Sequence, residues 1–245
     1  MSSKAAPATP DQRGSGTKLT MHATAQLSRS DSNTTDMLSR PPPGFSHWSS
    51  SCTGVVFCGG KSSRMGVDKA LLVDGEGRSL LERACATLRP IAGEVRLACG
   101  AQARYAELGL PLILDQRAEG GPLAALEAAL EHSSTRWLVV LACDMPRIST
   151  PTLVELLRKS EAEDLDACWL KTSKGAEPLC AVYSRACLEP VRTALDAGLR
   201  RMIAFHVYPA AGRALRLASL DFDLPGLTQN LNTPADWDDF RKGTR

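Results

Sequence analysis

The residues best suited to chemistry lie where a short apolar run passes into a turn of small and basic residues. Residues 54–69 read GVVFCGGKSSRMGVDK. Glycines let a backbone approach a phosphate closely, and the N–H groups of such a turn can cradle the phosphate oxygens. Because the basic side chains would neutralise the phosphate charge, this segment predicts a nucleotide-binding loop.

Two common phosphate-binding loops do not fit this segment. A P-loop of the form G-x-x-x-x-G-K-[ST] would need a glycine at position 55, where the chain has Val55. The dinucleotide fingerprint G-x-G-x-x-G is also absent, because Gly59 and Gly60 are followed by KSSR. The segment therefore predicts a nucleotide site of another type.

Charged residues in and near this loop are the catalytic candidates. Lys69 is a flexible point charge suited to a phosphate whose charge shifts during reaction, and Arg64 can bind phosphate oxygens as a fork. Asp144 directly follows the apolar run 137–143. Magnesium takes one or two carboxylates together with phosphate oxygens and water, so Asp144 is the metal candidate. The structural alternatives are a solvated lysine, an ion-paired arginine and a helix-capping aspartate.

Five further polar residues are candidates for binding substrates. Asp115 precedes a glycine-rich loop that can fold over a base or a triphosphate. Asn230 and Asn232 are two residues apart, so in an extended segment both side chains face the same way. Arg200 and Arg201 could receive an anionic substrate. Turn, cap or solvated helix-start roles are the alternatives for these residues.

Alternating apolar runs and helical patterns indicate how the candidates are positioned. Strands are predicted at 55–58, 95–99, 111–114, 137–142, 167–170, 179–183 and 215–217. Helices are predicted at 79–88, 103–108, 122–131 and 185–197, and two more are predicted to start with Thr150 and Thr233 as N-caps, each followed by a proline at the first helical position. Short apolar runs separated by helices predict an α/β fold with a mostly parallel sheet and helices on both faces. Ligands of such sheets bind outside the carboxyl ends of the strands, where most of the candidates fall.

The composition limits the classes of partner. The chain has 245 residues, a net charge of +2 and 23% charged residues, so there is no electrostatic case for a nucleic-acid or membrane-surface partner. It contains no apolar run long enough to span a bilayer. Its eight cysteines form no C-x-x-C pair, which favours buried reduced thiols of a cytoplasmic enzyme over a zinc site.

Residues 1–50 differ from the rest of the chain. They are rich in serine, threonine and proline and contain few large apolar residues. Such a segment cannot bury enough apolar surface to offset its ordering entropy, so we expect residues 1–50 to be disordered and residues 51–245 to form the domain. Met21 and Met37 are alternative start positions, and the segment lacks the continuous apolar core of a secretory signal.

Taken together, the motifs resemble those of the molybdenum cofactor guanylyltransferases of MobA type. The resemblance is carried by G-G-x-x-x-R-M-G-x-D-K-A-L-L from residue 59, Asp115 with GPLA at 121–124, C-D-x-P at 143–146, A-G-x-R-R at 197–201 and N-x-N-T-P at 230–234. It covers residues 54–240. It implies a three-layer Rossmann-like nucleotidyltransferase fold, and a reaction in which GTP and molybdopterin give the guanine dinucleotide and pyrophosphate.

The resemblance also implies roles for individual residues. Phe57, Cys58, Gly59 and Gly60 would lie at the GTP, and Lys69 would bind its phosphates. The aspartates matching Asp115 and Asp144 would contact GTP, with Asp144 also holding Mg²⁺. The segment containing Asn230 and Asn232 would lie on the metal and pterin side, and Arg200 and Arg201 would also face the second substrate. A protein that delivers the cofactor, or a recipient molybdoenzyme, would be a transient partner.

Two departures from the family pattern keep other functions open. The chain has Cys58 where the family usually has alanine, and its residues 98–100 are ACG where some members have an asparagine that helps to read guanine. The alternatives are a molybdopterin cytidylyltransferase, a sugar or polyol phosphate nucleotidyltransferase, and a non-catalytic nucleotide- or cofactor-binding protein. The presence of both Lys69 and Asp144 favours catalysis.

Overall fold

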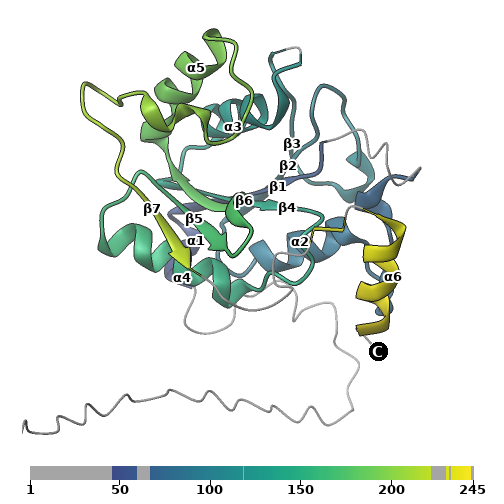
Figure 1. The fold of residues 1–245 in the computed structure, drawn as a ribbon. Coiled ribbons are helices and arrows are strands. Elements are labelled where there is room, and N and C mark those ends of the chain that lie inside the picture. Colours follow the sequence, from purple (N-terminus) through teal and green to yellow (C-terminus); the bar gives the residue numbers. More distant parts are fainter. Residues whose placement is uncertain (1–45, 60–66, 118, 222–229, 232, 244–245) are drawn as a thin grey trace, which may run out of the picture. The chain divides into compact units, whose positions relative to one another are not determined.

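The computed structural model describes residues 46–59, 67–117, 119–221, 230–231 and 233–243. All of them belong to one compact unit, Thr35–Arg245. Within the described residues, seven strands form one sheet in the order β3-β2-β1-β4-β6-β5-β7 (Figure 1). The strands are β1 Cys52–Phe57, β2 Glu94–Ala98, β3 Leu112–Ile113, β4 Trp137–Ala142, β5 Ala167–Thr172, β6 Gly175–Ser184 and β7 Leu217–Asp221.

The sheet is mostly parallel, as predicted. Neighbouring strands pair in parallel except at β6, which is antiparallel to both β4 and β5. The reason is the connection between β5 and β6, which leaves only residues 173 and 174 between them. A connection of this length can form a hairpin but not a crossover.

Helices cover both faces of the sheet and complete the predicted three layers (Figure 1). The helices α3 Gly121–His132 and α5 Leu188–Asp196 pack on one face, and α2 Leu80–Leu88 and α4 Thr150–Ala162 pack on the other. The last helix, α6 Pro234–Gly243, lies against α2 through a separate apolar cluster. That cluster consists of Leu80, Leu231, Trp237 and Phe240.

The starts of α2 and α6 follow the sequence signals, whereas α5 begins at Leu188, after the 3-10 turn Arg185–Cys187, and the helix predicted at 103–108 is a 3-10 turn at Ala106–Leu108. Ser79 and Glu82 form a reciprocal capping box at the start of α2. At α6 the Asp236 N–H donates to Thr233 Oγ1, and the Thr233 N–H donates back to the Asp236 carboxylate. Helix α4 begins at Thr150, so its N-cap is Ser149.

The folded part of the chain begins earlier than predicted. Helix α1, Ser46–Ser49, precedes the first strand, and its Trp48 is only 2% exposed. The fold therefore extends a few residues before the predicted boundary at residue 50, because one large aromatic side chain anchors a segment whose average composition is polar. The expectation of disorder for residues 1–45 lies outside the described residues.

Four parallel strands end in one row, which sets up the site. The register pairs Phe57 of β1 with Ala98 of β2 and with Ala142 of β4, and it pairs Ala98 with Ile113 of β3. The loops that follow these residues therefore leave the sheet side by side. Cys58, Gly100, Asp115 and Asp144 thus come together although the sequence separates them widely.

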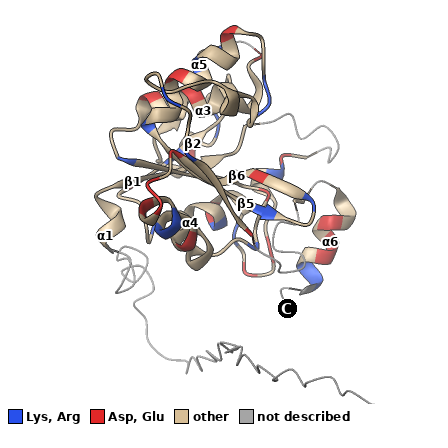
Figure 2. Cartoon of the chain, turned by 60° about the vertical axis from the view of Figure 1, so that its left-hand side comes forward, with Lys and Arg blue, Asp and Glu red and all other residues tan. Residues whose placement is uncertain are grey.

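Charged side chains of both signs are distributed over the helices on both sides of the sheet (Figure 2). In the part of the chain that the structure describes, no helix is long and apolar enough to cross a membrane.

Candidate active site

A cavity of about 560 Å³ opens at the carboxyl ends of the four parallel strands. Its volume is within the range of small-molecule sites. Its walls are formed by Phe57, Cys58, Gly59, Asp68, Lys69, Ala70, Ala98, Gly100, Ala101, Asp115, Arg117, Glu119, Gly120, Gly121, Pro122, Ala125, Ala142, Cys143, Asp144 and Leu179. The structure thus gathers the described nucleotide-binding candidates around one space.

Asp144 and Lys69 form an ion pair in the wall of this cavity. Lys69 Nζ lies 3.7 Å from Asp144 Oδ2, and the two side chains are 15% and 24% exposed. Burial raises the pKa of the Asp144 carboxyl, and the neighbouring Lys69 opposes that rise only partly. Burial disfavours the ionised form of this carboxyl, and Lys69 compensates only in part. The carboxylate would therefore be stabilised by a bound cation, or by a ligand that brings a cation with it.

Asp68 lies in the wall of the cavity, and its carboxylate is used to position Lys69. Its Oδ1 accepts a hydrogen bond from the Ala70 N–H at 3.1 Å, which caps the short 3-10 helix Lys69–Leu71. Its Oδ2 accepts a hydrogen bond of 2.7 Å from the Tyr105 hydroxyl and lies 3.5 Å from Arg104 Nη1. These contacts fix the start of the turn that carries Lys69.

Asp115 presents an unsatisfied oxygen. Its N–H donates to the Gly100 carbonyl at 2.9 Å, which places Asp115 beside the end of β2. Its buried Oδ1 has no hydrogen-bond partner among the described residues, and burial raises the pKa of its carboxyl. Buried polar atoms without partners are rare in proteins, so this oxygen is an unused hydrogen-bond acceptor in a residue that lines the cavity.

The segment before α6 lies beside Asp144. The Leu231 N–H donates to the Asp144 carbonyl at 3.1 Å, and the Leu231 side chain is buried in the α2–α6 cluster. The neighbouring Asn230 Oδ1 is buried and has no hydrogen-bond partner among the described residues. A carboxylate and an amide oxygen are hard ligands that suit Mg²⁺.

The described residues supply part of a metal coordination shell. No group of three or more His, Cys, Asp or Glu side chains that could hold a metal occurs within the described residues. Such a site suits an ion that binds together with the oxygens of a nucleotide, as magnesium commonly does.

The predicted role of Cys58 and Gly59 needs a correction. Both residues line the cavity, but their N–H groups donate to the Ala98 carbonyl at 3.0 and 2.9 Å and are not free to cradle a phosphate. An added Cβ on Gly59 would lie 2.8 Å from the Gly100 nitrogen. Glycine is therefore required at 59 by the close approach of two loops. The Cys58 Sγ lies 3.8 Å from the Cys99 Sγ, and all eight cysteines are buried and free, as predicted.

Arg200 and Arg201 do not line the cavity. The Arg200 guanidinium donates to the carbonyl oxygens of Leu195, Leu199 and Glu119 at 3.2, 2.9 and 3.2 Å. It therefore holds backbone in place, a role that the sequence did not suggest. Arg201 is exposed. Gly60, Arg64 and Asn232 lie outside the described residues.

Three site features were missed from the sequence. Arg117 lines the cavity and binds carboxylates on two helices. Arg104 donates to the Cys58 carbonyl at 3.2 Å and thus links both ends of the loop before Lys69. Glu177 lies near the start of β6, which runs antiparallel to β4, and burial, with a contribution from Asp144, raises the pKa of its carboxyl. None of the three belongs to a motif, so no local signal identified them.

Comparison with known proteins agrees with this arrangement. A probable molybdenum cofactor guanylyltransferase from Pelotomaculum thermopropionicum is 33% identical over 188 residues, covering 75% of this chain and 89% of that protein. The molybdenum cofactor guanylyltransferase of Serratia proteamaculans is 31% identical over 155 residues, covering 62% of this chain and 78% of that protein.

Solved structures show the same fold. Molybdopterin-guanine dinucleotide biosynthesis protein A from Archaeoglobus fulgidus superposes with a TM-score of 0.65 at 24% identity, covering 78% of this chain and 98% of that chain. The model of the MobA-like NTP transferase domain matches residues 54–214, which include Lys69, Asp115 and Asp144. By its sequence, its fold and the position of its cavity, the chain belongs to the family of MobA-like NTP transferase domains.

Proposed function

We propose that this protein transfers GMP from GTP to molybdopterin, giving the guanine dinucleotide form of the cofactor and pyrophosphate. The observation that carries the proposal is the Lys69–Asp144 pair in the wall of a nucleotide-sized cavity, with unsatisfied oxygens on Asp115 and Asn230. Relatives that share this sequence pattern are named molybdenum cofactor guanylyltransferases.

The reaction brings two negatively charged phosphates together, and the positive charges of the site would reduce their repulsion. A terminal phosphate oxygen of the pterin attacks the α-phosphorus, the bond from that phosphorus to its bridging oxygen breaks, and pyrophosphate leaves. The attacking phosphate is already anionic at neutral pH, so no strong general base is needed. Lys69 stabilises the negative charge on the transferring phosphate, with Arg64 as a further cation on the same loop.

A divalent cation fits the residues of the site. Mg²⁺ would be held by the Asp144 carboxylate, with the Asn230 amide oxygen and Asn232 on the same segment. When bound, it would screen the phosphate charges and stabilise the in-line transition state. The ionised Asp144 carboxylate would attract the cation, and Lys69 opposes the rise in the pKa of this carboxyl that burial causes.

The charge distribution separates the base from the phosphates. Asp115 would repel a triphosphate, so its unsatisfied Oδ1 suits N–H donors of the base, and guanine offers two adjacent donors. Ala98, Gly100 and Ala101 form the adjoining wall and offer no side-chain amide to the base. Because of that wall, CTP is the second candidate nucleotide, with the same chemistry. The reduced thiols suit a cytoplasmic enzyme.

The test is isothermal titration of the full-length protein with GTP, CTP, ATP and UTP, with and without Mg²⁺, followed by an assay of pyrophosphate release with molybdopterin. Preferential Mg²⁺-dependent binding of GTP and release of pyrophosphate only with the pterin are expected. Preference for CTP would move the enzyme to the cytidylyl reaction. Binding without turnover would contradict catalysis.

A further inference from the structure

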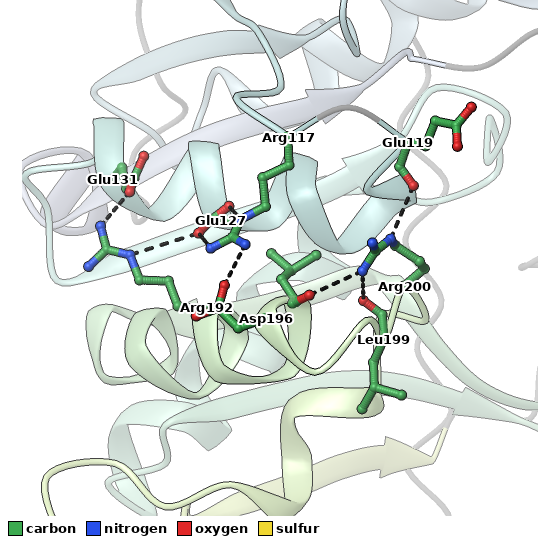
Figure 3. A network of polar contacts seen from close by, with 9 residues as sticks. Arg117, Glu119, Glu127, Glu131, Arg192, Asp196, Leu199 and Arg200 are labelled. Carbon is green, nitrogen blue, oxygen red and sulfur yellow. Dashed lines mark hydrogen bonds and ion pairs between the residues drawn. The ribbon is translucent and has the colours of Figure 1, made fainter.

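Arg117 connects the loop at the base end of the cavity to two helices on one face of the sheet (Figure 3). Its Nε and Nη2 donate to both oxygens of Glu127 on α3 at 2.8 and 2.9 Å, and its Nη1 donates to Asp196 on α5 at 2.6 Å. The Glu127 residue is 4% exposed. Because its charge is compensated by these two carboxylates, Arg117 is occupied by the protein and is not free to bind a phosphate.

Arg200 holds the same loop from the other side (Figure 3). Its Nε donates to the Glu119 carbonyl at 3.2 Å, while its Nη1 donates to two carbonyls at the end of α5. Glu119 has a φ of 54°, which is uncommon for a residue with a side chain, and Gly121 has a φ of 63°. An added Cβ on Gly121 would lie 3.5 Å from the Arg200 carbonyl oxygen.

The loop fixed by these arginines starts at Asp115, the acceptor that the cavity offers to a base. Where this loop enters α3, Glu119 and the first helical residue, Gly121, have positive φ, and an added Cβ on Gly120 between them would lie 2.2 Å from the Ala124 Cβ. A backbone conformation of this kind persists only when surrounding contacts stabilise it. Other elements hold this loop at three described points: the Gly100 carbonyl binds the Asp115 N–H, Glu127 and Asp196 bind the Arg117 side chain, and Arg200 binds the Glu119 carbonyl.

We propose that Arg117 and Arg200 are positioning residues that set the place of Asp115 against the nucleotide base, so that Arg200 acts on nucleotide affinity and not on the second substrate. The proposal rests on the proposed function for the identity of the nucleotide. It assigns Arg200 a different role from the anion-binding one suggested by its sequence motif.

The test measures the dissociation constant of Mg²⁺–GTP by isothermal titration for Arg117→Met, Arg200→Met and Arg200→Lys, with thermal unfolding recorded for each variant. The two methionine variants should bind GTP about tenfold more weakly, because the loop loses its charge-assisted contacts. Lysine at 200 retains a donor for the Glu119 carbonyl and should restore part of the affinity. Pyrophosphate, which lacks a base, should bind all variants as it binds the wild type.

The matched control is Arg192→Met. Arg192 on α5 also joins this helix to α3, through Glu131, and its Nε lies 3.8 Å from Glu127 Oε1 (Figure 3). Its other partner, Glu189, lies on α5 itself. All of these partners lie on the two helices and none on the loop. The variant should lower the unfolding temperature and leave the GTP dissociation constant unchanged. If Arg117→Met does not fold, Asp196→Asn removes the charge of its exposed partner and serves in its place.

A double-mutant cycle with Asp115→Asn decides whether the arginines act through Asp115. If they do, Arg200→Met should weaken GTP binding much less in the Asp115→Asn background than in the wild type. Wild-type affinity for GTP in both methionine variants, or an effect equal in the two backgrounds, would overturn the proposal. Failure of the wild-type protein to bind any nucleotide would instead overturn the proposed function.

Discussion

The protein contains two pairs of aspartates that are largely withdrawn from water but bonded in opposite ways. Asp74 and Asp166 are 6% and 3% exposed and lie away from the cavity. Asp166 accepts hydrogen bonds from Arg213 at 2.6 and 2.7 Å and from the Arg216 N–H at 2.7 Å. Asp74 accepts hydrogen bonds from two backbone N–H groups and from Arg83 Nε.

The pKa shifts of the two pairs have opposite signs. At Asp74 and Asp166, burial acts to raise the pKa, but hydrogen bonds from arginine and backbone N–H groups outweigh it and lower the pKa. At Asp115 and Asp144, burial prevails and raises the pKa. Asp74 and Asp166 stabilise loops and strand ends through their hydrogen bonds. The carboxylates of Asp115 and Asp144 would instead gain hydrogen bonds or charge compensation from a ligand. Among these four aspartates, the two at the cavity are the ones whose burial is not outweighed by hydrogen bonds.

The largest effect that tests this contrast is on catalysis. Asp144→Asn keeps the size of the side chain but removes the charge that would hold the cation. Removing one electrostatic stabiliser of a transition state costs about 10²-fold or more in rate, or about 3 kcal/mol. We expect Asp144→Asn to lose pyrophosphate release by that factor without a fall in thermal stability. Turnover within a few-fold of the wild type would remove Asp144 from the mechanism.

The corresponding change in the scaffold should affect stability instead. Asp166→Asn replaces an acceptor oxygen by an amide that cannot pair with both Arg213 and the Arg216 N–H. Arg213 is 45% exposed and regains water, so the loss is expected to be about 2 kcal/mol of unfolding free energy. Urea unfolding measures it. The GTP dissociation constant of the folded variant should match the wild type, and a large change in affinity would contradict the division between the pairs.

A smaller effect is expected at Asp115. Asp115→Asn removes the charge of this side chain and offers a weaker hydrogen-bond acceptor to the base. The dissociation constant of GTP should rise about tenfold, which corresponds to a loss of about 1.4 kcal/mol of binding free energy. The unfolding temperature should stay the same or rise, because a buried charge without a partner is removed. Isothermal titration with GTP measures the affinity, and thermal unfolding measures the stability. A fall in stability would show that the Asp115 carboxylate is paired in the folded protein.

The smallest effect is the dependence of stability on pH, and its sign differs between the pairs. The folded-state pKa of Asp144 is raised, so the folded state binds more protons in the window above the ordinary aspartate pKa, and stability falls as pH rises through it. The folded-state pKa of Asp166 is lowered, so its stabilisation is present above the ordinary pKa and is lost as pH falls towards the lowered value.

Comparing each asparagine variant with the wild type across pH isolates these contributions. The penalty of Asp166→Asn should shrink as pH falls below the ordinary aspartate pKa. The stability of Asp144→Asn relative to the wild type should grow as pH rises above it, because only the wild type then has to ionise a buried carboxyl. Urea unfolding at a series of pH values measures both trends. Parallel curves for the two variants would contradict the opposite signs.

Much of the site could be predicted from the sequence because its signals are local. An apolar run followed at once by Asp144, or by the loop before Lys69, places a polar group at the carboxyl end of a parallel strand whatever the rest of the chain does. The strand ends at Phe57, Ala98, Ile113 and Ala142 then share one row because parallel neighbours pair in register. The alternation of strands and helices also indicated the fold class.

Only the tertiary structure decided which backbone and side-chain groups remain available. The sequence could not show that the Cys58 and Gly59 N–H groups donate to the Ala98 carbonyl, or that Arg200 donates to the Glu119 carbonyl, because these partners are distant along the chain. It could not show that Trp48 is buried, since burial depends on what packs around it. Residue type and spacing determine which chemistry is present, whereas the partners that folding supplies determine which of those groups stay free for a ligand.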